Sequence, residues 1–161
     1  MTGVSLYRTS IAPDWIDYNG HLRDAYYGLI VSYASDALLE RLGLDAAYRE
    51  RTGCTLYTLE SHVHYLSEVK QSDVVTVTVR VLAADEKRIH AAFDLTCEGQ
   101  PRPAASAECL LLHVHQGTPV STRVFPPAIT AAIGALLRTT AGVATDIPGS
   151  RRIELRPPRA G

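Results

Sequence analysis

The sequence predicts an α+β fold in which one long helix is wrapped by a five-stranded antiparallel sheet. Apolar residues recur at helical spacing over residues 25–42, the longest such pattern in the chain. Four β-rich segments follow at hairpin spacing over residues 55–116, which favours antiparallel pairing with one face packed on the helix. A short alternating segment at 4–11 supplies the fifth strand.

Turn and cap residues separate these elements. Asp24 directly precedes the long helix and is predicted to be its N-cap, and Gly43 is expected to end it. Residues 45–52 predict a short second helix. The individual strands are expected at 55–66, 74–82, 88–98 and 104–116.

The composition is that of a globular cytoplasmic protein. The chain has 161 residues, 46% of them hydrophobic, and a net charge of −1, which gives no strong attraction to nucleic acid or to an anionic membrane. No signal peptide and no apolar run near the roughly 18 residues of a membrane span are visible. Three cysteines, without a CxxC pair, indicate reduced thiols.

The chain is predicted to divide into a main domain over residues 1–125 and a C-terminal part over residues 126–161. Residues 126–138 have helical spacing, and the chain beyond residue 139 is rich in glycine, proline and arginine. We expect this end to be extended or mobile.

Chemically active side chains concentrate in residues 15–27. Asp17 and His21 flank an Asn-Gly pair, which favours a turn, so both are expected on a loop directly before the long helix. The first amides of a helix are unpaired and carry a partial positive charge. A carboxylate beside such amides suits attack on a polarised carbonyl.

The pattern Asp17-x-x-Gly20-His21, followed by a helix with Tyr27 in its first turn, resembles the motif of hotdog-fold acyl-CoA thioesterases related to 4-hydroxybenzoyl-CoA thioesterase. That motif usually continues Val-Asn-Asn, where this chain has Leu-Arg-Asp. The segments 15–21, 57–62 and 84–90 together resemble the betainyl-CoA thioesterases of carnitine breakdown.

The resemblance implies hydrolysis of an acyl-CoA, most of all betainyl-CoA, without a bound cofactor. It also implies a homodimer or a dimer of dimers with active sites between protomers. Asp17 would act as nucleophile or as general base on water, and the amides around Arg23 and Asp24 would polarise the thioester carbonyl. The alternatives are a hotdog thioesterase for another short or aromatic acyl-CoA and a non-catalytic acyl-CoA-binding module.

Further site residues are predicted beside Asp17. His21 could orient Asp17, act as a second acid–base group or only fix the loop through a hydrogen bond, and we expect the orienting role. Glu60, unusual inside a strand, either is exposed or belongs to the site, where it would activate water or pair with an ammonium group. Aromatic faces attract such a cation. The predicted substrate-binding residues are Asn19, Gly20, Arg23, Asp24, Tyr18, Tyr26 and Tyr57.

No metal site is predicted. His62 and His64 share one strand face, as do His113 and His115, because side chains alternate along a strand. No cysteine or carboxylate completes either pair at an ordinary ligand spacing. The resemblance implies that coenzyme A takes part only as a portion of the substrate.

Overall fold

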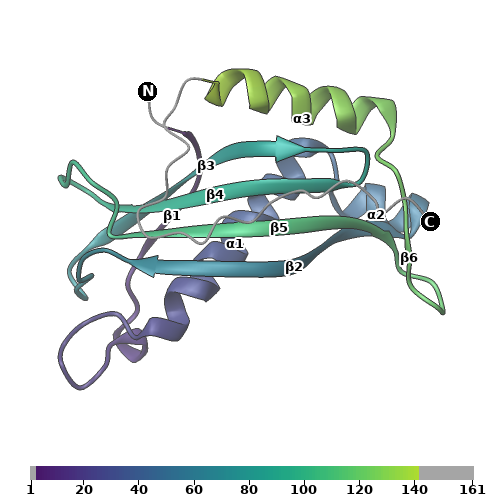
Figure 1. Cartoon of the computed structure of the whole chain (residues 1–161). Coiled ribbons are helices and arrows are strands. Elements are labelled where there is room, and N and C mark those ends of the chain that lie inside the picture. Colours follow the sequence, from purple (N-terminus) through teal and green to yellow (C-terminus); the bar gives the residue numbers. More distant parts are fainter. Residues whose placement is uncertain (1–2, 142–161) are drawn as a thin grey trace.

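The computed structural model describes residues 3–141, which form one antiparallel sheet with α1 behind it and α3 along β3 (Figure 1). The α+β class and the long helix are as predicted, whereas the short strand β6 and a 3-10 turn were not. The elements are β1 Val4–Ser10, η1 Pro13–Trp15, α1 Asp24–Leu42, α2 Ala46–Thr52, β2 Cys54–Tyr65, β3 Val74–Ala84, β4 Arg88–Cys97, β5 Ala105–His115, β6 Ser121–Thr122 and α3 Pro127–Thr140.

The strand order is β1-β3-β4-β5-β2, and β6 pairs with the end of β5. All neighbouring strands are antiparallel. This order places β2, the strand directly after the helices, at one edge of the sheet, where it pairs with β5 alone. One side of a 12-residue strand is therefore unpaired within the described chain.

The helix α1 forms because its apolar residues recur every three or four positions and meet the sheet on one face. Ile30, Ala34 and Leu38 are fully buried there. Gly43 ends the helix with a φ of 82°, the left-handed conformation that favours glycine. The predicted start was wrong by one residue, because Arg23 is the N-cap and the Asp24 carboxylate accepts the Ala25 N–H inside the first turn.

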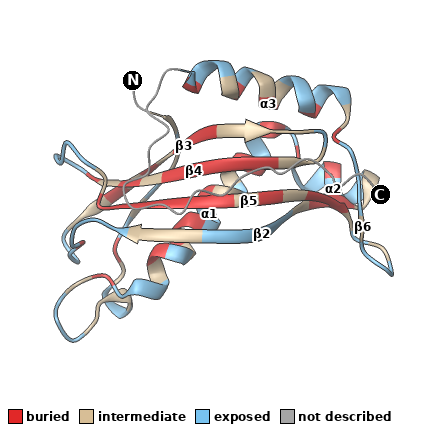
Figure 2. Cartoon of the chain, viewed as in Figure 1, coloured by how far each residue is buried: buried red, intermediate tan, exposed pale blue. Residues whose placement is uncertain are grey.

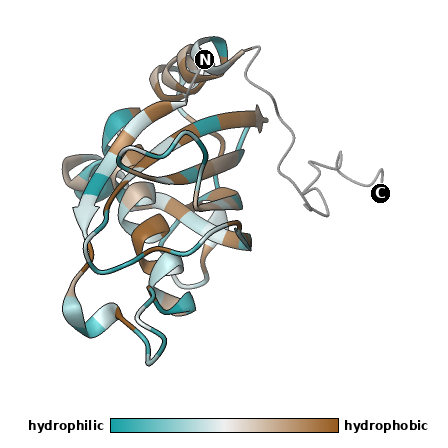
Figure 3. Ribbon diagram, turned by 90° about the vertical axis from the view of Figure 1, so that its left-hand side faces the viewer, coloured by the Kyte–Doolittle hydropathy of each residue, from teal (hydrophilic) through white to brown (hydrophobic). Residues whose placement is uncertain are grey.

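The core lies between α1 and the helix-facing side of the sheet. Alternation along β3 buries Val75, Val77 and Val79 completely, and Phe93 on β4 is the largest fully buried side chain. Figure 2 shows β4 and β5 as largely buried while much of β2 is exposed. The side view of Figure 3 shows the sheet curving over α1, with hydrophobic residues on both layers.

The helix α3 packs mainly against β3 and approaches the end of α1. Ile129, Ile133 and Leu136 are buried on one of its faces, as the helical spacing of residues 126–138 predicts. Its last residue anchors it, because the Thr140 hydroxyl donates to the Val81 carbonyl at 3.2 Å. The expectation for the chain beyond residue 141 lies outside the described residues.

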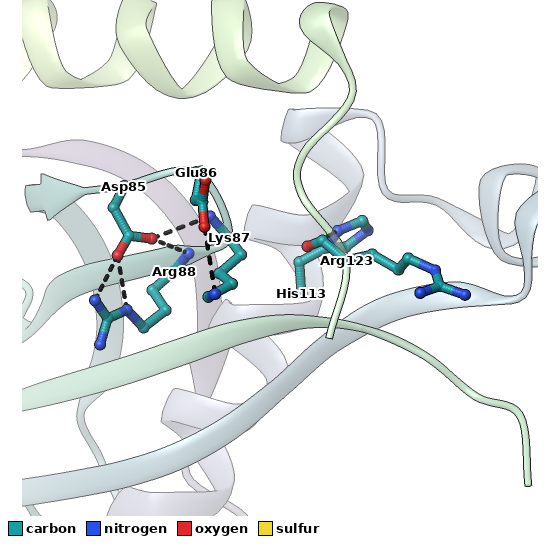
Figure 4. Close-up of polar contacts among 6 residues, drawn as sticks. All are labelled: Asp85, Glu86, Lys87, Arg88, His113 and Arg123. Atoms are coloured by element: carbon teal, nitrogen blue, oxygen red, sulfur yellow. Dashed lines mark hydrogen bonds and ion pairs between the residues drawn. The ribbon is translucent and has the colours of Figure 1, made fainter. Parts of the chain in front are cut away.

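A buried histidine fixes the segment between β5 and α3 to the end of the sheet (Figure 4). The Arg123 carbonyl accepts only, so His113 Nδ1 donates to it at 3.0 Å, and His113 Nε2 lies at hydrogen-bond distance, 3.0 Å, from the Tyr48 hydroxyl. Phe125 stacks on the same imidazole with ring centroids 5.0 Å apart. These contacts connect α2, β5 and the segment that leads into α3.

Candidate active site

The loop before α1 is a closed turn built by its own backbone. The Asp17 N–H donates to the His21 carbonyl at 2.8 Å, and the Gly20 N–H donates to the Asp17 carbonyl at 3.1 Å. Gly20 has a φ of 81°, which explains the glycine at this position. The Leu22 N–H then donates to the Val69 carbonyl at 2.7 Å, so the loop is attached to the chain between β2 and β3.

The Asp17 carboxylate is held by backbone amides. Its Oδ1 accepts the Asn19 N–H at 2.8 Å and the His21 N–H at 3.1 Å, which leaves Oδ2 outside these two hydrogen bonds. The hydrogen bond from the His21 amide, followed by those from Asn19, lowers the pKa of Asp17 against a smaller opposing effect of desolvation. The result is an oriented and ionised carboxylate on a hydrogen-bonded loop.

The start of α1 offers one unpaired backbone donor close to this loop. The Arg23 N–H is taken by the Trp15 carbonyl at 2.9 Å, and the Ala25 N–H by the Asp24 carboxylate at 2.9 Å. Within residues 3–141, the Asp24 N–H has no acceptor. Of the amide donors predicted around Arg23 and Asp24, only the N–H of Asp24 is therefore available to a ligand within the described residues.

The imidazole of His21 contacts a carboxylate other than Asp17. His21 Nε2 lies 3.1 Å from Glu68 Oε2, while only the main-chain amide of His21 holds Asp17. Sequence reasoning missed Glu68, because an acid in the segment after β2 carries no motif signal. The antiparallel bridge between His21 and Lys70, two residues further on, brings it here.

A groove of about 380 Å³ begins one turn beyond the helix start and runs between α1 and β2. Gly28, Ser32 and Ser35 line its helix side, and Thr58 and Ser61 line its strand side. The rest of the lining is apolar apart from Asp36, so the groove can hold an acyl group that carries a polar or charged part.

A β-bulge decides which residues of β2 face this groove. Leu56 and Thr58 line it, and strict alternation would place Glu60 there as well. The register shifts between Thr58 and Glu60, so Ser61 faces the groove instead. Glu60 lies on the opposite face of the strand.

Glu60 is therefore not brought next to Asp17 within one protomer. Its Oε1 lies 2.9 Å from His62 Nε2, and its side chain is about half exposed. Tyr65 is the residue of β2 that contacts the helix start, and Glu60 precedes it by five residues, about 17 Å along a strand. Of the two alternatives predicted for Glu60, solvent exposure or a place in the site, the single chain therefore shows exposure.

The predicted tyrosines fall in three different places. Tyr26 stacks on Trp15 beside the helix start, with ring centroids 5.2 Å apart and planes at 16°. Tyr18 is 94% exposed, directly after Asp17. Tyr57 is on β2, eight residues before Tyr65, so only Tyr26 and Tyr18 lie near Asp17 within the protomer.

The two His-x-His pairs lie apart. His62 pairs with Glu108 across β2 and β5, whereas His113 pairs with Leu56 near the other end of β2. Among the described residues, no three His, Cys, Asp or Glu side chains gather as a metal-binding set. No helix in residues 3–141 is long and apolar enough to cross a membrane.

Comparison with known proteins places this loop and groove in a family. The model of the thioesterase-like superfamily matches residues 11–133, which is most of the chain. The chain belongs to the thioesterase-like superfamily. It is 42% identical over 133 residues to the betainyl-CoA thioesterase of Pseudomonas aeruginosa, and the match covers 83% of each chain.

Two further relatives extend this comparison. The chain is 35% identical over 147 residues to the L-carnitine dehydrogenase/betainyl-CoA thioesterase of Agrobacterium fabrum, of which it spans 30%. It is 28% identical to a Staphylococcus aureus protein solved in complex with CoA, with a TM-score of 0.84 over 97% of this chain and 98% of that one. The hotdog fold and the thioesterase resemblance inferred from the motif are confirmed.

Proposed function

We propose that this protein hydrolyses betainyl-CoA to glycine betaine and CoA in carnitine breakdown. The observation that carries this proposal is that the loop before α1 presents an oriented Asp17 carboxylate and the helix start beside it presents an Asp24 N–H without an acceptor in residues 3–141. The similarity to betainyl-CoA thioesterase over most of the chain supports the choice of acyl group.

The reaction needs a nucleophile and a donor for the developing oxyanion. Asp17 takes a proton from water, whose oxygen then bonds to the thioester carbon, or its own oxygen bonds to that carbon first and water later releases the acid. In both routes the C–S bond breaks and the CoA sulfur leaves with the electron pair and gains a proton. The Asp24 N–H stabilises the negative charge on the carbonyl oxygen.

No resident cofactor takes part in this proposal. A carboxylate, water and a backbone donor together supply every proton and electron pair that thioester hydrolysis requires. We place the enzyme in the cytoplasm, which agrees with three cysteines that are all buried and unpaired by disulfides.

We further propose a homodimer formed by the exposed edge of β2. Within residues 3–141, its outer side is unpaired over 12 residues, and the strand contains neither proline nor lysine to block pairing. Tyr57, Leu59 and Tyr65 expose 38%, 54% and 56% of their surface along it. Because the groove runs along the same edge, a second β2 would cover the groove and close a pocket between protomers.

Replacing Leu59 by lysine is expected to weaken this dimer at least about tenfold in Kd, because the charge would be placed in the strand pairing. Sedimentation equilibrium at micromolar concentration measures the effect. Val124→Lys is the matched control, because Val124 is 60% exposed on the segment after β6. A monomeric wild type, or an unchanged Kd in Leu59→Lys, would contradict the proposed interface.

The acyl group is tested with a neutral isostere of the betainyl group. We expect kcat/KM for betainyl-CoA to exceed that for 3,3-dimethylbutanoyl-CoA by at least about tenfold, since about 1.4 kcal/mol of differential binding suffices. Release of free CoA thiol reports both reactions. Equal rates would be consistent with thioesterase activity but would contradict betainyl-CoA as the preferred substrate. If no short acyl-CoA released CoA, a binding module would be favoured.

A further inference from the structure

One acidic side chain, Asp24, and one aromatic side chain, Tyr65, lie between the catalytic loop and the groove. Of the two, only Asp24 was predicted there from the sequence. Asp24 lies one helical turn before Gly28 and on the same side of α1, because residues four apart share a face. Gly28 is the first residue of the groove on its helix side. The Asp24 side chain therefore extends the helix wall of the groove toward the Asp17 loop.

Tyr65 extends the opposite wall in the same direction. From Glu60 to Tyr65 the pairing with β5 is continuous, so Tyr65 shares a strand face with Ser61, which lines the groove. The Tyr65 hydroxyl donates to the Asp24 carbonyl at 3.4 Å, so the two walls meet at the helix start.

The ring of Tyr65 is fixed in place and still accessible. Its edge-to-face contact with the buried Tyr27, with centroids 5.1 Å apart and planes at 84°, sets its orientation. In the single protomer the residue nevertheless remains 56% exposed. A fixed aromatic face beside a carboxylate is an arrangement that attracts quaternary ammonium groups.

The charges around the helix start favour a cationic acyl group. Three carboxylates lie here, those of Asp17, Asp24 and Glu68, against the cations Arg23 and Lys70. In betainyl-CoA a single methylene separates the ammonium from the carbonyl carbon. A thioester bound at the Asp24 N–H therefore has its ammonium group within a few ångströms of this site, as bond lengths require.

We infer that Tyr65, together with the Asp24 carboxylate, receives the quaternary ammonium of the acyl group and determines specificity for it. This inference rests on the proposed hydrolysis of betainyl-CoA and assigns the cation to residues other than Tyr57 and Glu60. Within one protomer, Tyr57 lies near the far end of β2, and Glu60 lies on its other face.

The test compares two substrates in matched variants. Tyr65→Leu is expected to lower kcat/KM for betainyl-CoA about tenfold and to change that for 3,3-dimethylbutanoyl-CoA by less than roughly twofold, because only the charged group gains from the ring. Tyr65→Phe keeps the ring and is expected to keep the preference. Tyr33→Leu, which removes a 41% exposed tyrosine of α1 that contacts Tyr7, is the control.

A second variant keeps the test decisive if Tyr65→Leu does not fold. Asp24→Asn retains an oxygen that can accept the Ala25 N–H, so the helix start is preserved, and it is expected to reduce the preference for betainyl-CoA severalfold. A preference unchanged in Tyr65→Leu and Asp24→Asn, or an equal loss on both substrates, would overturn the inference. A wild type without preference would instead overturn the betaine assignment itself.

Discussion

Asp17→Asn is expected to lower kcat for betainyl-CoA by about two to four orders of magnitude, as the loss of a positioned acid–base group does. The asparagine oxygen still accepts the Asn19 and His21 N–H groups, so the turn is retained. The amide can neither take a proton from water nor act as a carboxylate nucleophile. Steady-state release of CoA thiol measures the loss.

The control is Asp14→Asn, which changes an exposed acid of η1 and should leave kcat unchanged. Far-UV circular dichroism and the melting temperature verify that both variants are folded. Wild-type turnover by a folded Asp17→Asn protein would exclude Asp17 from the chemistry.

The pH dependence of the wild type provides a second check on Asp17. Its pKa is lowered, so the carboxylate stays ionised at every pH above that lowered value and loses its charge only as the pH falls through it. If Asp17 is the base, the acid limb of kcat/KM is expected below the ordinary pKa of an aspartate. An acid limb near neutral pH would assign the step to another group.

Phe93→Ala is expected to lower the free energy of unfolding by about 3–5 kcal/mol. Phe93 is fully buried on β4, on the face of the sheet that packs on α1, and its removal leaves a cavity beside the helix that begins at Asp24. Urea denaturation at one fixed protein concentration measures the change, because dimer formation would make stability depend on concentration.

Phe93→Leu is the graded comparison. It retains most of the buried volume, so its loss of stability should be clearly smaller than that of Phe93→Ala. A loss below about 1 kcal/mol in Phe93→Ala would contradict the packing described here, because it lies well under the range for truncation of a buried phenylalanine.

Local patterns in the sequence were enough to predict the elements and the loop. The period of 3.6 residues located α1, and the alternating valines located β3 to within two residues of its observed end. Gly20 and Gly43 both have the positive φ that their positions indicated. These features depend on interactions among residues close in the chain, which composition and spacing report directly.

The positions of Glu60 and Tyr65 could not be predicted in this way. Side chains alternate along a strand, so a single extra residue reverses every later assignment of faces. The bulge between Thr58 and Glu60 does this, and it turns Glu60 away from the groove that Ser61 lines. Nothing in the spacing of the strand marks where the bulge falls.

The sequence by itself therefore determined the hotdog class, the loop that carries Asp17 and the helix start beside it. Only the tertiary structure decided that His21 pairs with Glu68, that the Asp24 amide has no acceptor within residues 3–141 and that Tyr65 contacts the helix start. The contacts of His21 and Tyr65 depend on strand order and register, which bring distant segments together through backbone pairing that side-chain spacing does not encode.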